Sequence, residues 1–266
     1  MIKTVKSADG TLIAYKKTGE GPPLVLVHGT IDDHTYWEMV QPAMAEHFTV
    51  YAIDRRGRGQ SGDAAGYKLE LEFDDVAAVV DMIDQPVLLL GHSYGGLIAL
   101  EAALRTDNLS KLILYEPPIF EGAEEPDDFR LKTFGKIETS VNEGKNEQAL
   151  LVFLEILIEM SPGEIDEARS TPYWQVMVNA APTLPRELQA GAEYKFDAAQ
   201  FKGLAIPTLL LSGSESPIFL KEATKILERS LNNSRVATLE GQAHDAARTA
   251  PVLFTENVLK FVRESV

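Results

Sequence analysis

The chain has 266 residues, 45% of them hydrophobic, and a formal net charge of −15 at pH 7. This length and composition suffice for one α/β domain with an insertion. The acidity argues against nucleic acid as a partner, because no basic stripe can replace phosphate counterions. The absence of cysteine excludes disulfides and thiol catalysis. With no apolar run of 18 residues and no apolar leader, we expect a cytoplasmic protein without a membrane span.

Short apolar segments alternate with helical ones along most of the chain. The first two segments, 2–7 and 11–17, flank a Gly turn and predict a β-hairpin. Further strands are expected at 23–27, 48–53, 87–90, 111–115, 208–211 and 235–239. Helices are expected at 36–46, 69–83, 95–105, 217–230 and 246–264. This alternation indicates a parallel sheet covered by helices on both faces, with ligands bound at the carboxyl ends of the strands.

The alternation is interrupted between the strands at 111–115 and 208–211. The intervening stretch has several prolines, no strand-like run and a helical periodicity at 147–159. It is too long for a plain loop, so we predict a helical insertion that covers the site. The expected division is a core domain, 1–116 and 204–266, and a helical cap, 117–203.

A serine lies where the strand at 87–90 meets the helix at 95–105. The sequence there is Gly91-His92-Ser93-Tyr94-Gly95-Gly96. A serine at such a corner is held in a strained conformation with its hydroxyl clear of the turn. The strain costs about 1–3 kcal/mol, and glycines are needed on both sides because a side chain would collide with the bend. The pattern predicts Ser93 as a nucleophile.

A nucleophilic serine needs a general base and backbone donors for the oxyanion. Of the five histidines, His244 lies in a loop of small residues between the last strand and the last helix. That loop belongs to the same edge of the sheet as Ser93, so His244 is the predicted base. The amide of Tyr94 follows from the corner geometry. The loop after 23–27 offers Thr30, preceded by Gly29, as the second donor.

Together these segments resemble the α/β-hydrolase superfamily over nearly the whole chain. The resemblance rests on His28-Gly29-Thr30, Asp-Arg-Arg-Gly-Arg-Gly-Gln-Ser at 54–61, the serine corner at 91–96, and Gly241-Gln-Ala-His244. Within the superfamily the chain is similar to esterases and lactonases with a small helical cap. The resemblance implies an eight-stranded, mostly parallel sheet with helices on both faces, a helical cap, and a Ser-acid-His triad.

The acid of that triad departs from the commonest family pattern. The segment 210–217 matches the family's Gly-x-x-Asp-Pro, but Ser216 stands in place of the aspartate. Some superfamily members instead place the acid after the sixth strand, where this chain has Glu116. A charged group directly after a buried apolar run needs a partner. Glu116 is therefore the predicted acid, Glu215 is the alternative, and a triad without a functional acid remains open.

Three further residues are candidates for the substrate pocket. His34 follows two aspartates in a loop expected near the pocket mouth, where a metal site lacks a third ligand. Trp174 and Met177 belong to an apolar stripe of the insertion that otherwise forms the core of the cap. We expect no metal and no cofactor.

These residues predict a serine hydrolase that acts on a small molecule. The expected substrate is a small, neutral, largely apolar carboxylic ester or lactone, cleaved through a Ser-His-Glu triad and an acyl-enzyme. One alternative is a lyase or a cofactor-free haloperoxidase-like activity on the same triad. Another is a non-catalytic, ligand-binding homologue, which Ser216 motivates. By the resemblance, a serine at the corner argues against dehalogenase and epoxide-hydrolase chemistry, which uses a carboxylate nucleophile.

Overall fold

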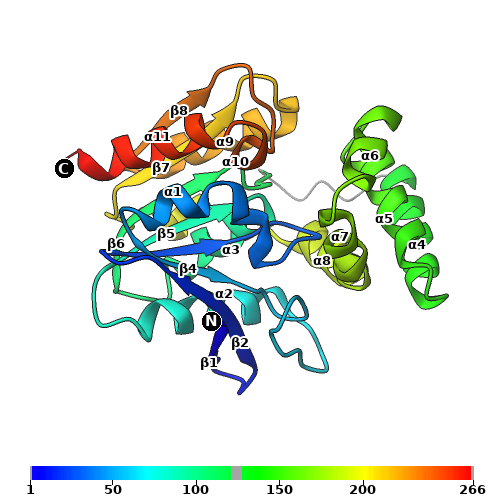
Figure 1. Cartoon of the computed structure of the whole chain (residues 1–266), viewed down its shortest axis with the longest axis horizontal. Coiled ribbons are helices and arrows are strands. Elements are labelled where there is room, and N and C mark those ends of the chain that lie inside the picture. Colours follow the sequence, from blue (N-terminus) through cyan, green and yellow to red (C-terminus); the bar gives the residue numbers. More distant parts are fainter. Residues whose placement is uncertain (1, 121–127, 265–266) are drawn as a thin grey trace.

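The computed structural model describes residues 2–120 and 128–264. Its centre is an eight-stranded sheet in the order β1-β2-β4-β3-β5-β6-β7-β8 (Figure 1). The strands are β1 (Ile2–Lys6), β2 (Leu12–Thr18), β3 (Pro23–Val27), β4 (Thr49–Ile53), β5 (Val87–His92), β6 (Leu109–Tyr115), β7 (Thr208–Gly213) and β8 (Ser234–Leu239). Strand β2 pairs antiparallel with β1 and β4, and the pairs from β4 to β8 are parallel. The predicted mostly parallel, eight-stranded sheet is confirmed.

Helices follow most of the strands. Around the sheet they are η1 (His34–Met39), α1 (Gln41–Ala45), α2 (Leu69–Asp81), α3 (Tyr94–Ala102), α9 (Ile218–Ser230), α10 (Ala246–Thr249) and α11 (Pro251–Arg263). Between β6 and β7 they are α4 (Asp128–Asn142), α5 (Asn146–Val152), η2 (Phe153–Leu157), α6 (Pro162–Arg169), α7 (Tyr173–Ala180), η3 (Ala181–Thr183), α8 (Leu184–Glu193) and η4 (Ala198–Phe201). None of the helices in the described ranges is long and apolar enough to cross a membrane.

Strict alternation along the buried strands divides the core between the two faces of the sheet. Val25 and Val27 of β3 point to the face that packs against α2, α3 and α9. Leu24 and Leu26 point to the opposite face, which packs against η1, α1 and α11. Because both faces are covered, the strands are continuously apolar, as expected of a parallel sheet.

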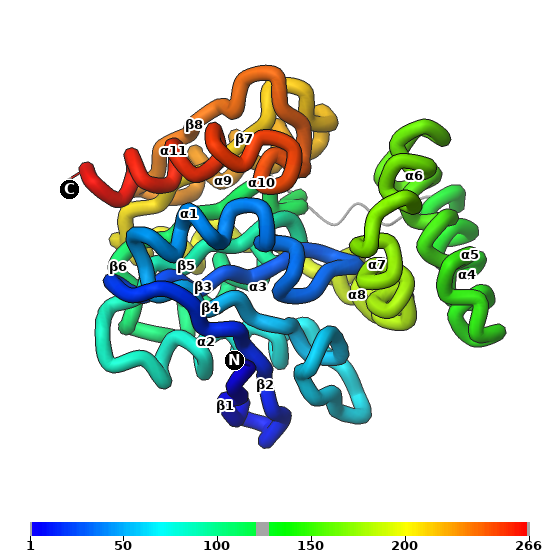
Figure 2. Tube along the Cα trace, viewed as in Figure 1, coloured from blue at the N-terminus to red at the C-terminus, as the bar shows by residue number. Residues whose placement is uncertain are grey.

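Phe201 of η4 packs into the core cluster on one face of the sheet. The other helices between β6 and β7, from α4 to α8, lie together at one end of the molecule, beside the sheet (Figures 1 and 2). They have an apolar cluster of their own, which includes Leu150, Phe153 and Leu184. One residue of the core, Ile31 in the loop after β3, belongs to the same cluster. This loop therefore lies against the insertion. Residues 121–127 of the predicted cap lie outside the described residues.

Proline divides two helices that the sequence predicted as continuous. The segment 36–46 forms a 3₁₀ helix and then α1, whose first turn contains Pro42. The segment 246–264 breaks at Ala250, because Pro251 has no N–H to continue the ladder of α10. In the insertion, the periodicity at 147–159 holds for α5 but changes to a π-helical turn, η2, at residue 153.

Candidate active site

Ser93 lies between the end of β5 and the first turn of α3. Its backbone has φ 54° and ψ −127°, a conformation that costs about 1–3 kcal/mol for a residue with a side chain. A Cβ at Gly91 would collide with the Gly95 carbonyl oxygen, and one at Gly95 with the His28 carbonyl oxygen. These glycines allow α3 to approach the sheet closely enough to form the corner. The strained turn predicted around Ser93 is present.

A buried carboxylate and the predicted base meet at the same edge of the sheet. Glu116 directly follows β6, is fully buried and has φ 45°. Its Oε2 lies 2.7 Å from Nδ1 of His244, which follows β8. Its Oε1 accepts hydrogen bonds from the Gly213 N–H at 2.7 Å and the Ser212 hydroxyl at 3.1 Å. Every oxygen of this buried carboxylate therefore has a partner.

These contacts set the charge of Glu116 and the orientation of the His244 ring. Burial by itself raises the pKa of Glu116, but the His244 hydrogen bond and charge, the Ser216 hydroxyl and the Gly213 N–H lower it below its usual value. The carboxylate is therefore ionised near neutral pH, and Nδ1–H of His244 donates to it. The Nε2 lone pair is then the free basic position of the ring. The His244 side chain keeps 25% of its surface exposed.

The alternative acid lies apart from this pair. Glu215 is exposed, and its carboxylate contacts only the neighbouring Ser214 hydroxyl among the described residues. Ser216 is buried near Glu116, and its Oγ would lie 2.6 Å from a Cβ at Gly213. The structure thus brings Glu116, rather than Glu215, to His244.

Two aromatic side chains that the sequence argument did not single out hold the His244 loop. The Tyr115 hydroxyl donates to the Ala243 carbonyl oxygen and accepts from the Ala246 N–H. Nε2 of His92 lies 2.9 Å from the His244 carbonyl oxygen, and the two rings are 4.6 Å apart. Since His92 precedes Ser93, this contact joins the His244 loop to the serine corner. The sequence indicates a role for Tyr115 and His92 only through their positions at the ends of apolar, strand-like runs.

The two predicted oxyanion donors are the residue after Ser93 and a residue of the turn after β3. Tyr94 begins α3, and the N–H groups of a first helical turn have no partner within the helix. Thr30 lies in the turn after β3, where Ile31 has φ 58°. Within the described ranges, the Thr30 amide donates to no protein acceptor. A Cβ at Gly29, the residue before it, would lie 3.1 Å from the Ser93 Cβ.

His34 contacts the carboxylate of Asp54, which is a third possible metal ligand beside Asp33 and His34. Nothing in the sequence indicated this contact. Ligand atoms of Asp33, His34 and Asp54 lie within 4.8 Å of one another. However, Nδ1 of His34 lies 2.7 Å from Oδ1 of Asp54, whereas two ligands of one tetrahedral zinc are about 3.4 Å apart. Asp54 also accepts from the backbone N–H groups of His34 and Gln60. This geometry is that of a hydrogen-bonded turn.

Trp174 and Met177 lie in the apolar cluster of the insertion. The Trp174 indole N–H donates to Glu147 at 3.2 Å, so that side chain is held within the insertion. A different residue of α7, Tyr173, reaches the core and donates to the buried Asp32. Oδ2 of Asp32 would lie 3.3 Å from a Cβ at Gly29, close to the serine corner.

The model of the alpha/beta hydrolase fold family matches residues 22–250. This match covers most of the chain, and the chain belongs to that family.

Two solved structures and one curated relative illustrate matches over nearly the full length. An α/β hydrolase from Sphaerobacter thermophilus has a TM-score of 0.84 and 31% identity, covering 98% of this chain and all of that one. An esterase from Rhodococcus sp. ECU1013 has a TM-score of 0.76 and 26% identity, covering 98% of each chain. The pimeloyl-[acyl-carrier protein] methyl ester esterase of Nitrosospira multiformis is 26% identical over 260 residues, 92% of this chain and 96% of that protein.

Proposed function

We propose that this chain is a serine esterase with the triad Ser93, His244 and Glu116. The observation that carries the proposal is the contact between the ionised, fully buried Glu116 and Nδ1 of His244, at the sheet edge where Ser93 forms its strained corner. A carboxylate in this role orients the imidazole and stabilises the imidazolium that forms in catalysis. The relatives named as esterases support the same chemistry.

Acylation uses the free nitrogen of the histidine. As Ser93 Oγ attacks the ester carbonyl carbon, its proton passes to Nε2 of His244. The carbonyl oxygen becomes an oxyanion that accepts from the N–H groups of Thr30 and Tyr94. When the carbon–oxygen bond to the alcohol breaks, His244 returns the proton to the leaving oxygen. The products are the free alcohol and an acyl-enzyme.

Deacylation repeats these steps with water as the nucleophile. His244 removes a proton from the water as it attacks the acyl carbon, and the oxyanion again binds between Thr30 and Tyr94. The proton then returns to Ser93 Oγ as the acid product leaves. This pathway needs no cofactor, because one base moves each proton.

The proposed substrate is a small, neutral, largely apolar carboxylic ester or lactone. Ile31, next to the proposed oxyanion donor Thr30, packs into the apolar cluster of the insertion. The net charge of −15 disfavours an anionic substrate. The methyl ester named for the relatives suggests a small alcohol part.

We also propose that residues 117–203 act as a cap on a core formed by 1–116 and 204–266. The helices from α4 to α8 share an apolar cluster, and α7 and α8 contact the core, as does η4, whose Phe201 packs into the core cluster. A cap held by a few polar contacts can exclude water from the acyl-enzyme and still release product.

The test is hydrolysis of p-nitrophenyl acetate, butyrate and octanoate and of γ- and δ-lactones. We expect turnover of the shorter esters by the wild-type protein and its loss, by about 10⁴-fold or more, in Ser93→Ala. Folded wild-type protein that hydrolyses none of these compounds would contradict the proposal and favour the lyase, haloperoxidase-like or binding alternatives.

A second serine in the same chain serves as the matched control. Ser61 donates to the Asp54 carbonyl oxygen and accepts from the Ala14 N–H at 2.8 Å, and neither bond involves a residue of the proposed triad. Ser61→Ala is expected to lower stability and to leave the rate per folded molecule unchanged. An equal loss of activity in Ser61→Ala and Ser93→Ala would contradict the assignment of Ser93 as the nucleophile.

A further inference from the structure

Arg55, the second residue after β4, lies fully buried between the oxyanion turn and the insertion. Its Nη1 donates to the Gly29 carbonyl oxygen at 2.9 Å. Its other nitrogens form a fork on Glu72 of α2, at 2.8 and 2.9 Å. Nη2 also contacts Glu187 of α8. One rigid guanidinium therefore joins a backbone carbonyl of the site to carboxylates of the core and of the insertion.

The Gly29 carbonyl oxygen accepts a second buried hydrogen bond. Nδ1 of His28 lies 2.9 Å from the Gly29 oxygen, and Nε2 of His28 accepts from the backbone N–H of Arg55 at 3.1 Å. Because Nε2 is an acceptor, the neutral ring carries its proton on Nδ1, and Nδ1 donates. Burial, followed by the nearby Arg55 and Arg58 charges, holds the pKa of His28 well below its usual value, which agrees with a neutral ring.

Two donors on one carbonyl fix the plane of the peptide that joins Gly29 to Thr30. In a trans peptide the C=O and the N–H point in opposite directions, and the group rotates as one unit. Holding the Gly29 oxygen therefore sets the direction of the Thr30 N–H. A rotation of the plane would break both buried hydrogen bonds, each with a substantial cost. Donation to the oxygen also polarises the peptide and strengthens its N–H as a donor.

Glu187 connects this arrangement to the insertion. It is 1% exposed, and its Oε1 also lies 2.7 Å from Nη2 of Arg58. Its backbone carbonyl accepts from the Tyr94 hydroxyl at 3.2 Å, and the Tyr94 ring lies 4.9 Å from the Arg55 guanidinium carbon. The carboxylate is thus desolvated only while α8 lies against the core. Without Glu187, the buried Arg55 and Arg58 would share Glu72 alone among the carboxylates described around them.

We propose that Arg55 is a positioning residue that orients the Gly29–Thr30 peptide so that the Thr30 N–H meets the oxyanion, and that Glu187 makes this orientation depend on the docked position of α8. The inference rests on the proposed esterase function and adds a link between cap docking and the oxyanion donor. Among the described residues, Arg55 forms no hydrogen bond with Ser93. In this proposal it acts through the Gly29 carbonyl that it holds.

The test variant is Arg55→Lys, assayed with p-nitrophenyl butyrate. Lysine retains the positive charge beside Glu72 and Glu187, but it lacks the planar fork that reaches Gly29 at the same time. We expect kcat per active site to fall by about 10- to 100-fold, with KM within about twofold. End-point labelling with a fluorophosphonate counts the active sites. The affinity for a trifluoromethyl ketone, whose adduct carries an oxyanion, should fall in parallel with kcat.

Arg56→Lys is the matched control. Arg56 is equally buried and pairs with Asp75 at 2.7 Å and with Asp9 at 3.0 Å, but it makes no contact with the oxyanion turn. We expect a similar fall in Tm and an unchanged kcat per active site. Equal losses of kcat in the two variants, or an Arg55→Lys kcat within twofold of wild type, would overturn the inference.

Glu187→Gln provides the second measurement. It tests the link between α8 and the Gly29–Thr30 peptide even if Arg55→Lys does not fold. The amide preserves the shape of the side chain and removes the charge that holds Arg55. We expect kcat and ketone affinity to fall together by about 3- to 10-fold. No change in either quantity would contradict the link to the cap. These results are separate from the proposed function, because that depends on labelling and turnover by the wild-type protein.

Discussion

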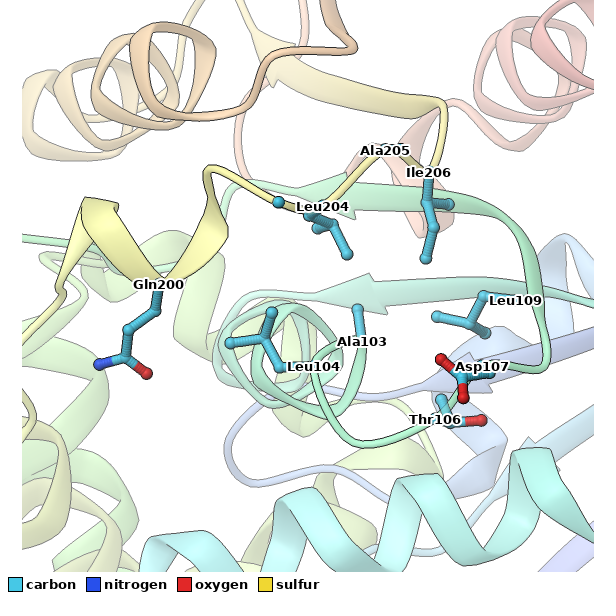
Figure 3. A pocket seen from close by; sticks show the side chains of 10 residues that line it. Ala103, Leu104, Thr106, Asp107, Leu109, Gln200, Leu204, Ala205 and Ile206 are labelled. Atoms are coloured by element: carbon cyan, nitrogen blue, oxygen red, sulfur yellow. The ribbon is translucent and has the colours of Figure 1, made fainter.

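The two ends of β6 and β7 differ sharply in chemistry. At their amino ends lies a hollow of about 380 Å³, lined by side chains such as Leu109, Leu204 and Ile206 (Figure 3). At their carboxyl ends lie Glu116 and Gly213, joined by a hydrogen bond within the buried contact to His244. The hollow at the amino ends contains no strained backbone and no buried charge pair among its lining residues.

Strained backbone distinguishes the candidate active site from the hollow at the amino ends. Non-glycine residues with positive φ lie at the carboxyl edge of the sheet, at Ile31, Ser93 and Glu116, and also at Glu159 in the insertion. Each costs folding free energy and persists only where the surroundings hold it. Parallel strands bring such turns together at one edge, because each strand ends there. The amino edge has no comparable reason to retain strain.

Removing the charge of Glu116 should give the largest effect. We expect Glu116→Gln to lower kcat for p-nitrophenyl butyrate by about 10⁴-fold, because the imidazolium loses its carboxylate. Steady-state kinetics with labelled active sites measures this loss. Glu215→Gln is the control, since its exposed carboxylate contacts neither His244 nor Glu116. A larger loss in Glu215→Gln would reverse the assignment of the acid.

A second experiment moves the carboxylate of the triad from position 116, after β6, to position 216, after β7. Glu116→Gly suits the positive φ at this position and vacates the carboxylate site. Adding Ser216→Asp returns a carboxylate from the loop after β7, beside Gly213. We expect the double variant to be about 10- to 100-fold faster than Glu116→Gly alone, because part of the triad is restored. No gain would show that the Ser216 position cannot supply the acid.

Ionisation of the buried Asp32, near the carboxyl edge of the sheet, should lower the free energy of unfolding. Burial, followed by repulsion from Asp245, raises its pKa well above the usual value. The folded state therefore binds its proton more tightly than the unfolded chain, and stability falls as pH rises above about 4. Asp32→Asn keeps an acceptor for Tyr173 and removes this titration. We expect Tm to rise by about 2–4 °C at pH 8 and to be unchanged at pH 4.

Thermal unfolding followed by circular dichroism at both pH values provides the readout. A shift of equal size at pH 4 and pH 8 would contradict the assignment of the cost to ionisation of Asp32.

Filling the hollow at the amino edge should have the smallest effect. Gly203 lines it, has no positive φ and would place a Cβ in open space. We expect Gly203→Leu to leave kcat and KM for p-nitrophenyl butyrate within about twofold of wild type, since the site lies at the opposite ends of the strands. A loss comparable to that of Glu116→Gln would show that the two edges are coupled.

Most of the fold could be predicted from the sequence, because buried parallel strands are uninterrupted apolar runs. The segment 23–27 is the clearest example, and β3 has the same bounds. The breaks at Val40 and Ala250 could not be located, since a proline in the first turn of a helix and one inside it give the same local pattern. The π-helical turn at 153 leaves no sign in the apolar periodicity.

Local sequence patterns predicted two features of the candidate site that the structure contains, the strained corner at Ser93 and the buried carboxylate of Glu116, but not its contacts between distant segments. The glycines around Ser93 indicate a strained corner before any coordinates are known. The charge of Glu116 after an apolar run indicates a buried partner. The sequence could not reveal the contact of His34 with Asp54, or that of Arg55 with Gly29, because each joins segments 20 or 26 residues apart.

The account depends on a single reactive serine, and mass spectrometry after reaction with a fluorophosphonate tests it most directly. We predict one adduct per wild-type chain, located on Ser93, with labelling slowed in Glu116→Gln and absent in Ser93→Ala. Folded wild-type protein that carries no adduct, or an adduct on a different serine, would contradict the account.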